Sequence, residues 1–150
     1  MPNDAPQFAA WLEDFFSAYY RNRPLMYTSS FCVAECFSAF KLKFLRGKIT
    51  REQYLSYIYE FYRLGVGSKP QIDDIEMLNP EFRSEAERLI NVHGIDFIDA
   101  VQIVTLLKGR YQHLVEGSRS ILITADRSLA KAARAEGARV WECTTEPRPV

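Results

Sequence analysis

Apolar positions in the first half of the chain recur with the period of an α-helix. Between residues 5 and 20 they fall at i, i+3, i+4, i+7, i+8 and i+11, which makes one face of an amphipathic helix. The same pattern predicts helices over residues 31–45 and 51–64, and Gly47 is expected to end the first of these two. Residues 25–28 form a short apolar run after a proline, which predicts a buried strand ahead of these two helices.

The second half alternates helical patterns with short apolar runs. Helices are predicted over residues 80–91 and 97–108, and over an alanine-rich stretch between the last two strands. Those strands are predicted at 121–124 and 139–143, and residues 71–78 form either a short strand or a turn. Each helix is preceded by candidate N-cap residues. These are Asp4, Ser29 or Ser30, Thr50 (in a capping box with Gln53), Asn79, Asp96, and Asp126 or Ser128.

Strands that alternate with helices indicate an α/β fold with a mostly parallel sheet. A length of 150 residues fits one domain, 1–150, with residues 144–150 as a flexible tail that contains two prolines. The 47% hydrophobic and 25% charged residues are ordinary for a globular protein and exclude a disordered or fibrous chain. No apolar run approaches the roughly 18 residues of a membrane-spanning helix, so we expect no membrane association.

Charge and cysteine content bear on the type of partner and on the cellular compartment of the protein. Nineteen Lys and Arg balance nineteen Asp and Glu, so net charge gives no general attraction to nucleic acid, although it does not exclude a local basic groove. Three cysteines are too few for a disulfide scaffold, which favours a reducing, cytoplasmic location. Cys32 and Cys36 have no His or second Cys pair nearby in the sequence, and we interpret them as buried free thiols.

Three acidic residues lie at the ends of predicted elements. Glu35 lies in the first turns of a helix that follows a strand, Asp99 lies in the first turn of another helix, and Asp126 follows the strand at 121–124. Because the C-terminal ends of parallel strands and the next helix N-termini share one edge of a sheet, ligands bind there. Three carboxylates at that edge would hold a hard cation such as Mg²⁺, which can activate water and stabilise charge on a phosphodiester.

Each acid also has a purely structural interpretation. Acidic side chains are favoured in the first turn of a helix because they complement its dipole. Asp96 followed by Asp99 fits an N-cap and an acid three residues later, and Asp126 fits a turn and cap residue. Spacing alone leaves both interpretations open.

The segments around the three acids follow one another in a specific order. They are Thr28-Ser29-Ser30-Phe31-Cys32-Val33-Ala34-Glu35, then Asp96-Phe97-Ile98-Asp99-Ala100, then Ile121-Leu122-Ile123-Thr124-Ala125-Asp126-Arg127-Ser128-Leu129-Ala130, with a terminal Gly-x-x-Val strand from Gly137 to Val140. In order and rough spacing over residues 25–143, they resemble the PIN-domain nucleases, and most closely the VapC-like toxins of type II toxin–antitoxin systems.

The resemblance implies a metal-dependent endoribonuclease, the toxin of a toxin–antitoxin pair, that cleaves RNA phosphodiesters with carboxylate-bound Mg²⁺ or Mn²⁺. It also implies a PIN-like three-layer fold, a mostly parallel sheet flanked by helices. Glu35, Asp99 and Asp126 match the family's metal-binding catalytic acids, and Thr124 matches the hydroxyl position two residues before the last acid. The implied partners are RNA, a cognate antitoxin and a second copy in a homodimer.

The chain departs from the family's pattern at its start. The family opens with an apolar strand that ends in a first aspartate, whereas this sequence starts almost at the first helix. Asp4 has no strand-forming residues before it, so we leave it out of the site. We expect the natural protein to carry that strand and aspartate ahead of Met1. The alternative is a PIN-like domain that has lost cleavage and serves as a binding module for protein or RNA.

The predicted helix over residues 51–64 is rich in aromatic residues. Its rings point around more than half of the helix, so the side away from the core is either exposed to a protein partner or buried on a second side. The residues predicted to contact an antitoxin helix or a second protomer are Tyr54, Tyr57, Ile58 and Phe61. Arg127 and Lys131 are candidates for phosphate contact, but most exposed cations are only solvated, and we assign them no role.

Overall fold

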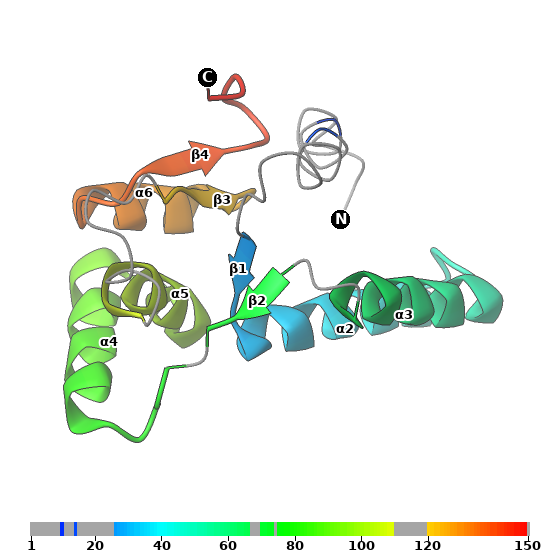
Figure 1. The fold of residues 1–150 in the computed structure, drawn as a ribbon, viewed down its shortest axis with the longest axis horizontal. Coiled ribbons are helices and arrows are strands. Elements are labelled where there is room, and N and C mark those ends of the chain that lie inside the picture. Colours follow the sequence, from blue (N-terminus) through cyan, green and yellow to red (C-terminus); the bar gives the residue numbers. More distant parts are fainter. Residues whose placement is uncertain are drawn as a thin grey trace. The chain divides into compact units, whose positions relative to one another are not determined.

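The computed structural model describes residues 10, 14, 26–66, 70–73, 75–109 and 120–149. The chain divides into two compact units, whose elements are labelled in Figure 1. The hairpin unit is Leu25–Asp73, and the core unit is Met1–Pro24 together with Asp74–Val150. The helix predicted over residues 5–20 lies outside the described residues except for Ala10 and Asp14. That helix, the strand expected ahead of Met1 and the single domain therefore stay predictions.

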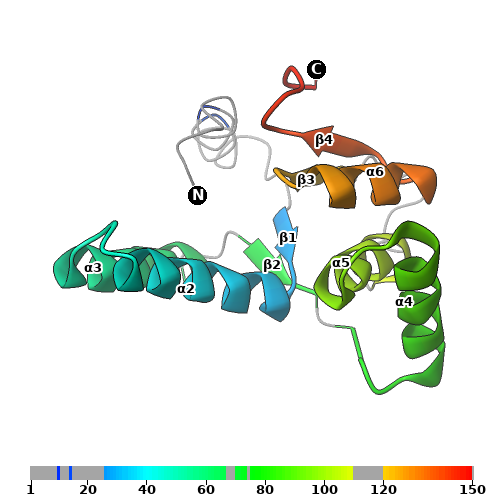
Figure 2. The ribbon, with the colours of Figure 1, turned by 180° about the vertical axis from the view of Figure 1, so that it is seen from behind.

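The hairpin unit consists of two parallel strands and two helices. Strand β1 (Met26–Thr28) pairs with β2 (Pro70–Ile72), with Tyr27 opposite Gln71. Helix α2 (Ser30–Leu45) and helix α3 (Arg51–Val66) follow β1 in the sequence and are drawn beside each other in Figure 2. The strand and both helices predicted for this part are confirmed, and the second helix is two residues longer than expected.

Local hydrogen bonds explain where the two hairpin helices begin. The side chain of Ser29 accepts a hydrogen bond from the Cys32 N–H at 3.2 Å and caps α2. At α3, the Gln53 N–H donates to Thr50 Oγ1 at 3.2 Å while the Thr50 N–H donates to Gln53 Oε1 at 2.9 Å. This is the predicted capping box, in which the side-chain oxygen of each residue accepts the backbone N–H of the other, so that two N–H groups without a partner inside the helix are both bound.

The two hairpin helices contact each other through aromatic rings, and no residue of α2 is buried. Each ring of α2 on this face meets a ring of α3 at the centroid distances usual for aromatic pairs. The pairs are Phe37–Phe61 at 5.1 Å, Phe40–Tyr57 at 5.7 Å and Phe44–Tyr54 at 5.5 Å. The rings of Phe37, Phe40 and Phe44 are therefore the contact face of α2, and they are only half-buried.

The core unit contains a helix pair and a strand–helix–strand segment. Its elements are α4 (Pro80–His93), α5 (Phe97–Lys108), β3 (Leu122–Thr124), α6 (Arg127–Ala135) and β4 (Val140–Glu142). Strands β3 and β4 pair in parallel, with Ile123 opposite Trp141, and α6 packs against both. All of these elements were predicted, with strands one to two residues shorter than expected.

Helix caps in the core unit also follow the sequence. Asn79 caps α4 ahead of Pro80, and Gly94 ends it in the left-handed region at φ +64°, a conformation that glycine adopts without strain. Asp96 caps α5 by accepting from the Asp99 N–H at 2.9 Å. The side chains of α4, α5 and α6 that face inward form the apolar core with Trp141 of β4.

Two further segments of the chain contain a turn. Residues 71–78 contain both predicted alternatives, the end of β2 and a turn at Met77 and Leu78. Residues 144–146 form a turn, because the Glu146 N–H donates to the Glu142 carbonyl at 3.0 Å and Trp141 Nε1 donates to the Glu146 carbonyl at 3.2 Å. The flexible tail over residues 144–150 stays a prediction.

The described strands pair in parallel within each unit, β1 with β2 in the hairpin unit and β3 with β4 in the core unit, and a single sheet stays a prediction. The chain is thus of mixed α/β structure with parallel strands, as predicted, while the PIN-like three-layer arrangement stays a prediction. In the part of the chain that the structure describes, no single helix is long and apolar enough to cross a membrane, and only the bent pair of α4 and α5, at 118°, reaches that length and composition together.

Candidate functional site

Asp126 lies between the C-terminal end of β3 and the first turn of α6. Its Oδ1 accepts from the Ser128 N–H at 2.7 Å and the Leu129 N–H at 3.0 Å, so Asp126 is the N-cap of α6. Its own N–H donates to Thr124 Oγ1 at 3.0 Å. The side chain is exposed, and its Oδ2 makes no hydrogen bond to the described residues. A carboxylate held by one oxygen can offer the other to a cation, so cap and ligand are compatible roles.

Asp99 lies in the first turn of α5, in the same unit. It is half-buried and is followed by Ala100 and Val101, which belong to the core. Its backbone N–H is bound by the Asp96 side chain, which confirms Asp96 as the cap of this helix. The position of Asp99 is therefore fixed by a capped, core-packed helix, which suits a residue that must present its carboxylate in one direction.

Glu35 lies in the second turn of α2, in the hairpin unit, and is exposed. Its helix begins at Ser29, directly after β1, as the sequence predicted. Each of the three acids thus lies at the end of the element where it was expected. Glu35 and the two aspartates nevertheless belong to different units.

Among the described residues, no three His, Cys, Asp or Glu side chains come together to hold a metal ion. The carboxylate oxygens of Glu35, Asp99 and Asp126 are the donor type that Mg²⁺ prefers, so their chemistry fits while their convergence stays a prediction. Thr124 has a definite local role, because its hydroxyl binds the backbone N–H of Asp126.

Cys32 and Cys36 are free, half-buried thiols one turn apart on α2, which is close to the buried free thiols that we predicted. The pKa of Cys36 is raised above its ordinary value by burial first and then by Cys32 and Glu35. The hydroxyl of Ser29 lies 3.2 Å from Cys32 Sγ. A raised pKa keeps the Cys36 thiol protonated at neutral pH, which disfavours nucleophilic or metal-binding roles.

The predicted partner surface on α3 proves to be divided between two faces. Tyr54, Tyr57 and Phe61 contact rings of α2, so they belong mainly to the hairpin's own packing. Tyr57 is nevertheless 41% exposed, and Tyr62, which is 59% exposed, also meets the ring of Phe37 at 5.4 Å. Leu55 and Tyr59 are exposed as well, with 54% and 66% of their surface open.

Sequence reasoning missed a buried glutamate in β4. Glu142 is only 4% exposed, and its carboxylate accepts hydrogen bonds from the Thr144 N–H at 3.1 Å and from the hydroxyls of Thr144 and Thr145. The available signal was the pair of threonines two and three residues after a strand glutamate, since such hydroxyls commonly bind nearby side chains and backbone.

An ion-pair network was also missed, and no local pattern could have revealed it. Glu136 at the end of α6 binds Arg88 of α4 at 2.6 Å and His93 Nε2 at 2.6 Å. Hydrogen bonds from Arg88 and then His93 lower the pKa of Glu136 to about 2. Arg88 also binds Glu85 at 2.8 Å. The network joins α4 to α6 and holds positive charge against two carboxylates.

In comparisons with protein families, with curated protein sequences and with solved structures, no match to this chain is found. Family and function therefore depend on the residues themselves, on the order of the three motifs and on the places of their acids in the structure.

Proposed function

We propose that the chain is a metal-dependent endoribonuclease of the PIN type, the toxin of a toxin–antitoxin pair, acting on RNA in the cytoplasm with Mg²⁺ or Mn²⁺. The observation that carries the proposal is the arrangement at the end of β3. Thr124 Oγ1 binds the Asp126 N–H, two helix N–H groups bind Asp126 Oδ1, and Oδ2 is left for a ligand. Asp99 is held in the first turn of α5 in the same unit.

In this proposal, three carboxylates of the chain would bind the cation through their negative charge and hold it in place. Asp126 and Asp99 offer carboxylates from fixed backbone positions, and Glu35 supplies a third from the start of α2. The proposal requires that these three meet around the cation in the working protein. A bound divalent cation there would activate water and stabilise the charge that develops on the phosphodiester.

For the partners, the proposal assigns the exposed side of α3 to an antitoxin or a second protomer. Leu55, Tyr59 and Tyr62 carry large apolar surfaces that lie open in the described structure. Aromatic anchors dominate the energetics of such interfaces. The rings of Tyr54, Tyr57 and Phe61, predicted for the same interface, contact α2, and Tyr57 keeps 41% of its surface exposed.

Cleavage of a fluorescent single-stranded RNA by the purified chain, with Mg²⁺, Mn²⁺ or EDTA, tests the proposal. We expect metal-dependent cleavage that D126N, D99N and E35Q each reduce by about a hundredfold or more, because each removes one anionic ligand. The matched control is D96N, since asparagine also caps helices and Asp96 caps α5. Cleavage unaffected by D126N, or absent with both metals, would contradict the nuclease.

The second candidate is a PIN-like binding module without cleavage. It is favoured by the exposed apolar side chains Leu55 and Tyr59 of α3, which suit a protein partner. Thermal unfolding separates the two candidates, because a cation that binds only the native state raises Tm by an amount that grows with the logarithm of its concentration once this exceeds Kd. A nuclease should gain several degrees with millimolar Mn²⁺ and lose this gain in D126N, whereas a binding module should show no metal effect.

A further inference from the structure

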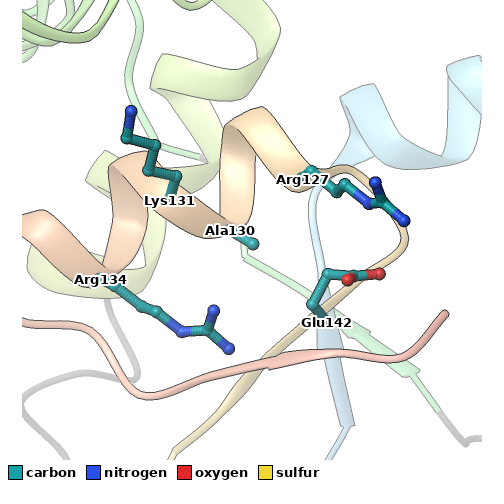
Figure 3. A pocket seen from close by; sticks show the side chains of 5 residues that line it. All are labelled: Arg127, Ala130, Lys131, Arg134 and Glu142. Carbon is teal, nitrogen blue, oxygen red and sulfur yellow. The ribbon is translucent and has the colours of Figure 1, made fainter. Parts of the chain in front are cut away.

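The face of α6 that looks onto β4 forms a hollow with a basic rim. Its volume is about 230 Å³, and it is lined by Arg127, Ala130, Lys131, Arg134 and Glu142. Figure 3 shows the three cationic side chains extending from α6 and Glu142 rising from β4 beside them. All five residues belong to the core unit.

The charges around the hollow are not equally engaged. Arg134 is held by Glu146 at 2.5 Å and by the Val140 carbonyl at 3.2 Å. Glu142 is buried and bound by its threonines. Arg127 and Lys131 are exposed, and neither forms an ion pair or hydrogen bond with the described residues. Two positive charges at the rim are thus free for an external anion.

Arg127 and Lys131 lie in a row along α6 that starts next to Asp126, the candidate metal-binding acid. Arg127 directly follows Asp126, and Lys131 lies one turn further along the same helix. At about 1.5 Å per residue, the row from Arg127 to Arg134 extends about 10 Å along α6. A nucleic-acid strand with one phosphate near Asp126 could therefore continue along this face of α6.

We propose that the basic face of α6 holds the sugar–phosphate backbone of single-stranded RNA next to the Asp126 end, with Arg127 and Lys131 binding its phosphates. The choice of RNA as ligand rests on the proposed function. The lining also favours it over an acidic protein, because Ala130 is the one apolar residue in the hollow, whereas protein interfaces need large apolar anchors. Arginine and lysine are the usual phosphate-binding side chains.

Binding of a fluorescein-labelled single-stranded RNA of mixed sequence to the whole chain, measured by anisotropy in EDTA, tests the inference without any cleavage. We expect R127A/K131A to weaken binding about tenfold at 100 mM salt. The slope of log affinity against log salt should fall by about 0.7 for each lost phosphate contact, or about 1.4 for the pair. R127K/K131R should restore both, and R83A, which removes an exposed arginine of α4, should leave both unchanged.

The outcomes separate this inference from the nuclease. RNA binding that depends on the two cations, in a chain that no metal makes cleave RNA, would support the basic face and overturn the nuclease. Metal-dependent cleavage with wild-type RNA affinity in R127A/K131A would overturn the basic face alone. Absence of RNA binding, or a poly-glutamate peptide that binds more tightly than RNA and depends on the same two residues, would also overturn it.

Discussion

The two units of the chain use their apolar residues in opposite ways. Every buried apolar side chain that the structure describes lies in the core unit, whereas the buried residues described in the hairpin unit are polar, Ser29 and Asp73. Helix α6 is short and alanine-rich, yet it buries Leu129 and three alanines. Helix α2 is longer and carries several phenylalanines, yet none of its residues is buried.

In these two units, the burial of a helix therefore depends more on how many elements pack against it than on the size of its side chains. Within its unit, α6 packs against both β3 and β4, and its alanines permit close approach. Helix α2 packs against α3, and large rings alone cannot enclose one another in a two-helix contact. The hairpin unit therefore keeps large apolar surfaces open in the described structure, which is the property expected of an interaction surface.

The largest expected effect contrasts two leucines, one on a helix of each unit. Leu89 of α4 has no exposed surface, and Leu55 of α3 is 54% exposed. L89A should lower the free energy of unfolding by about 3 kcal/mol, because it removes buried surface and leaves a cavity. L55A should change it by less than about 0.5 kcal/mol. Urea titration measures both, and equal losses would show that the hairpin unit has a core of its own.

A smaller effect is expected for the ion pairs that join α4 to α6. E136Q should cost about 2 kcal/mol at neutral pH, because Arg88 and His93 both lose a charged partner. E87Q is the control, since the Arg83–Glu87 pair is exposed and should contribute less than about 1 kcal/mol.

The contribution of Glu136 should also depend on pH. Its pKa is about 2 in the folded protein, below the ordinary value of 4.5. The carboxylate therefore stabilises the fold fully above pH 4.5, and this stabilisation is lost as the pH falls toward 2. Urea titrations of wild type and E136Q should differ most at pH 7 and converge only as the pH falls to about 2. A constant difference across this range would exclude the charge as the cause.

In the hairpin unit the capping box should have an effect of about 1 kcal/mol. T50A removes the hydroxyl that accepts from the Gln53 N–H at the start of α3. T50S keeps that hydroxyl and should be close to wild type. Circular dichroism during urea unfolding provides the measurement, and an equal loss in T50S would show that the methyl group, not the cap, is responsible.

The smallest effect on stability is expected at an exposed ring of α3. Y59S should change the free energy of unfolding by less than about 0.5 kcal/mol, since this side chain is 66% exposed. If the exposed side of α3 is a homodimer surface, the same variant should shift the chain from dimer to monomer in sedimentation velocity. A large loss of stability in the monomer would instead assign this ring to folding.

Local features of this protein were predictable from the sequence because they depend on neighbours a few residues apart. The capping box at Thr50, the caps Asn79 and Asp96, and the glycine end of α4 all form within one helical turn. The positions of Glu35, Asp99 and Asp126 at element ends follow from the same patterns. The choice between a strand and a turn for residues 71–78 was left open because the four apolar residues of this segment lie among acids without a helix or strand period.

The sequence by itself determined the helices, the strands and the places of the acids along them. Which apolar helix faces are covered by other elements depends on tertiary contacts. Helices α2 and α6 both have a clear apolar pattern in the sequence, but they differ in the elements that pack against them. Tertiary contacts likewise bring Glu136 to Arg88 and His93, and they leave Arg127 and Lys131 beside a hollow without an ion pair to any described residue. These contacts join residues that are far apart in the chain, or depend on which side chains remain free, and neither property leaves a periodic signal in sequence.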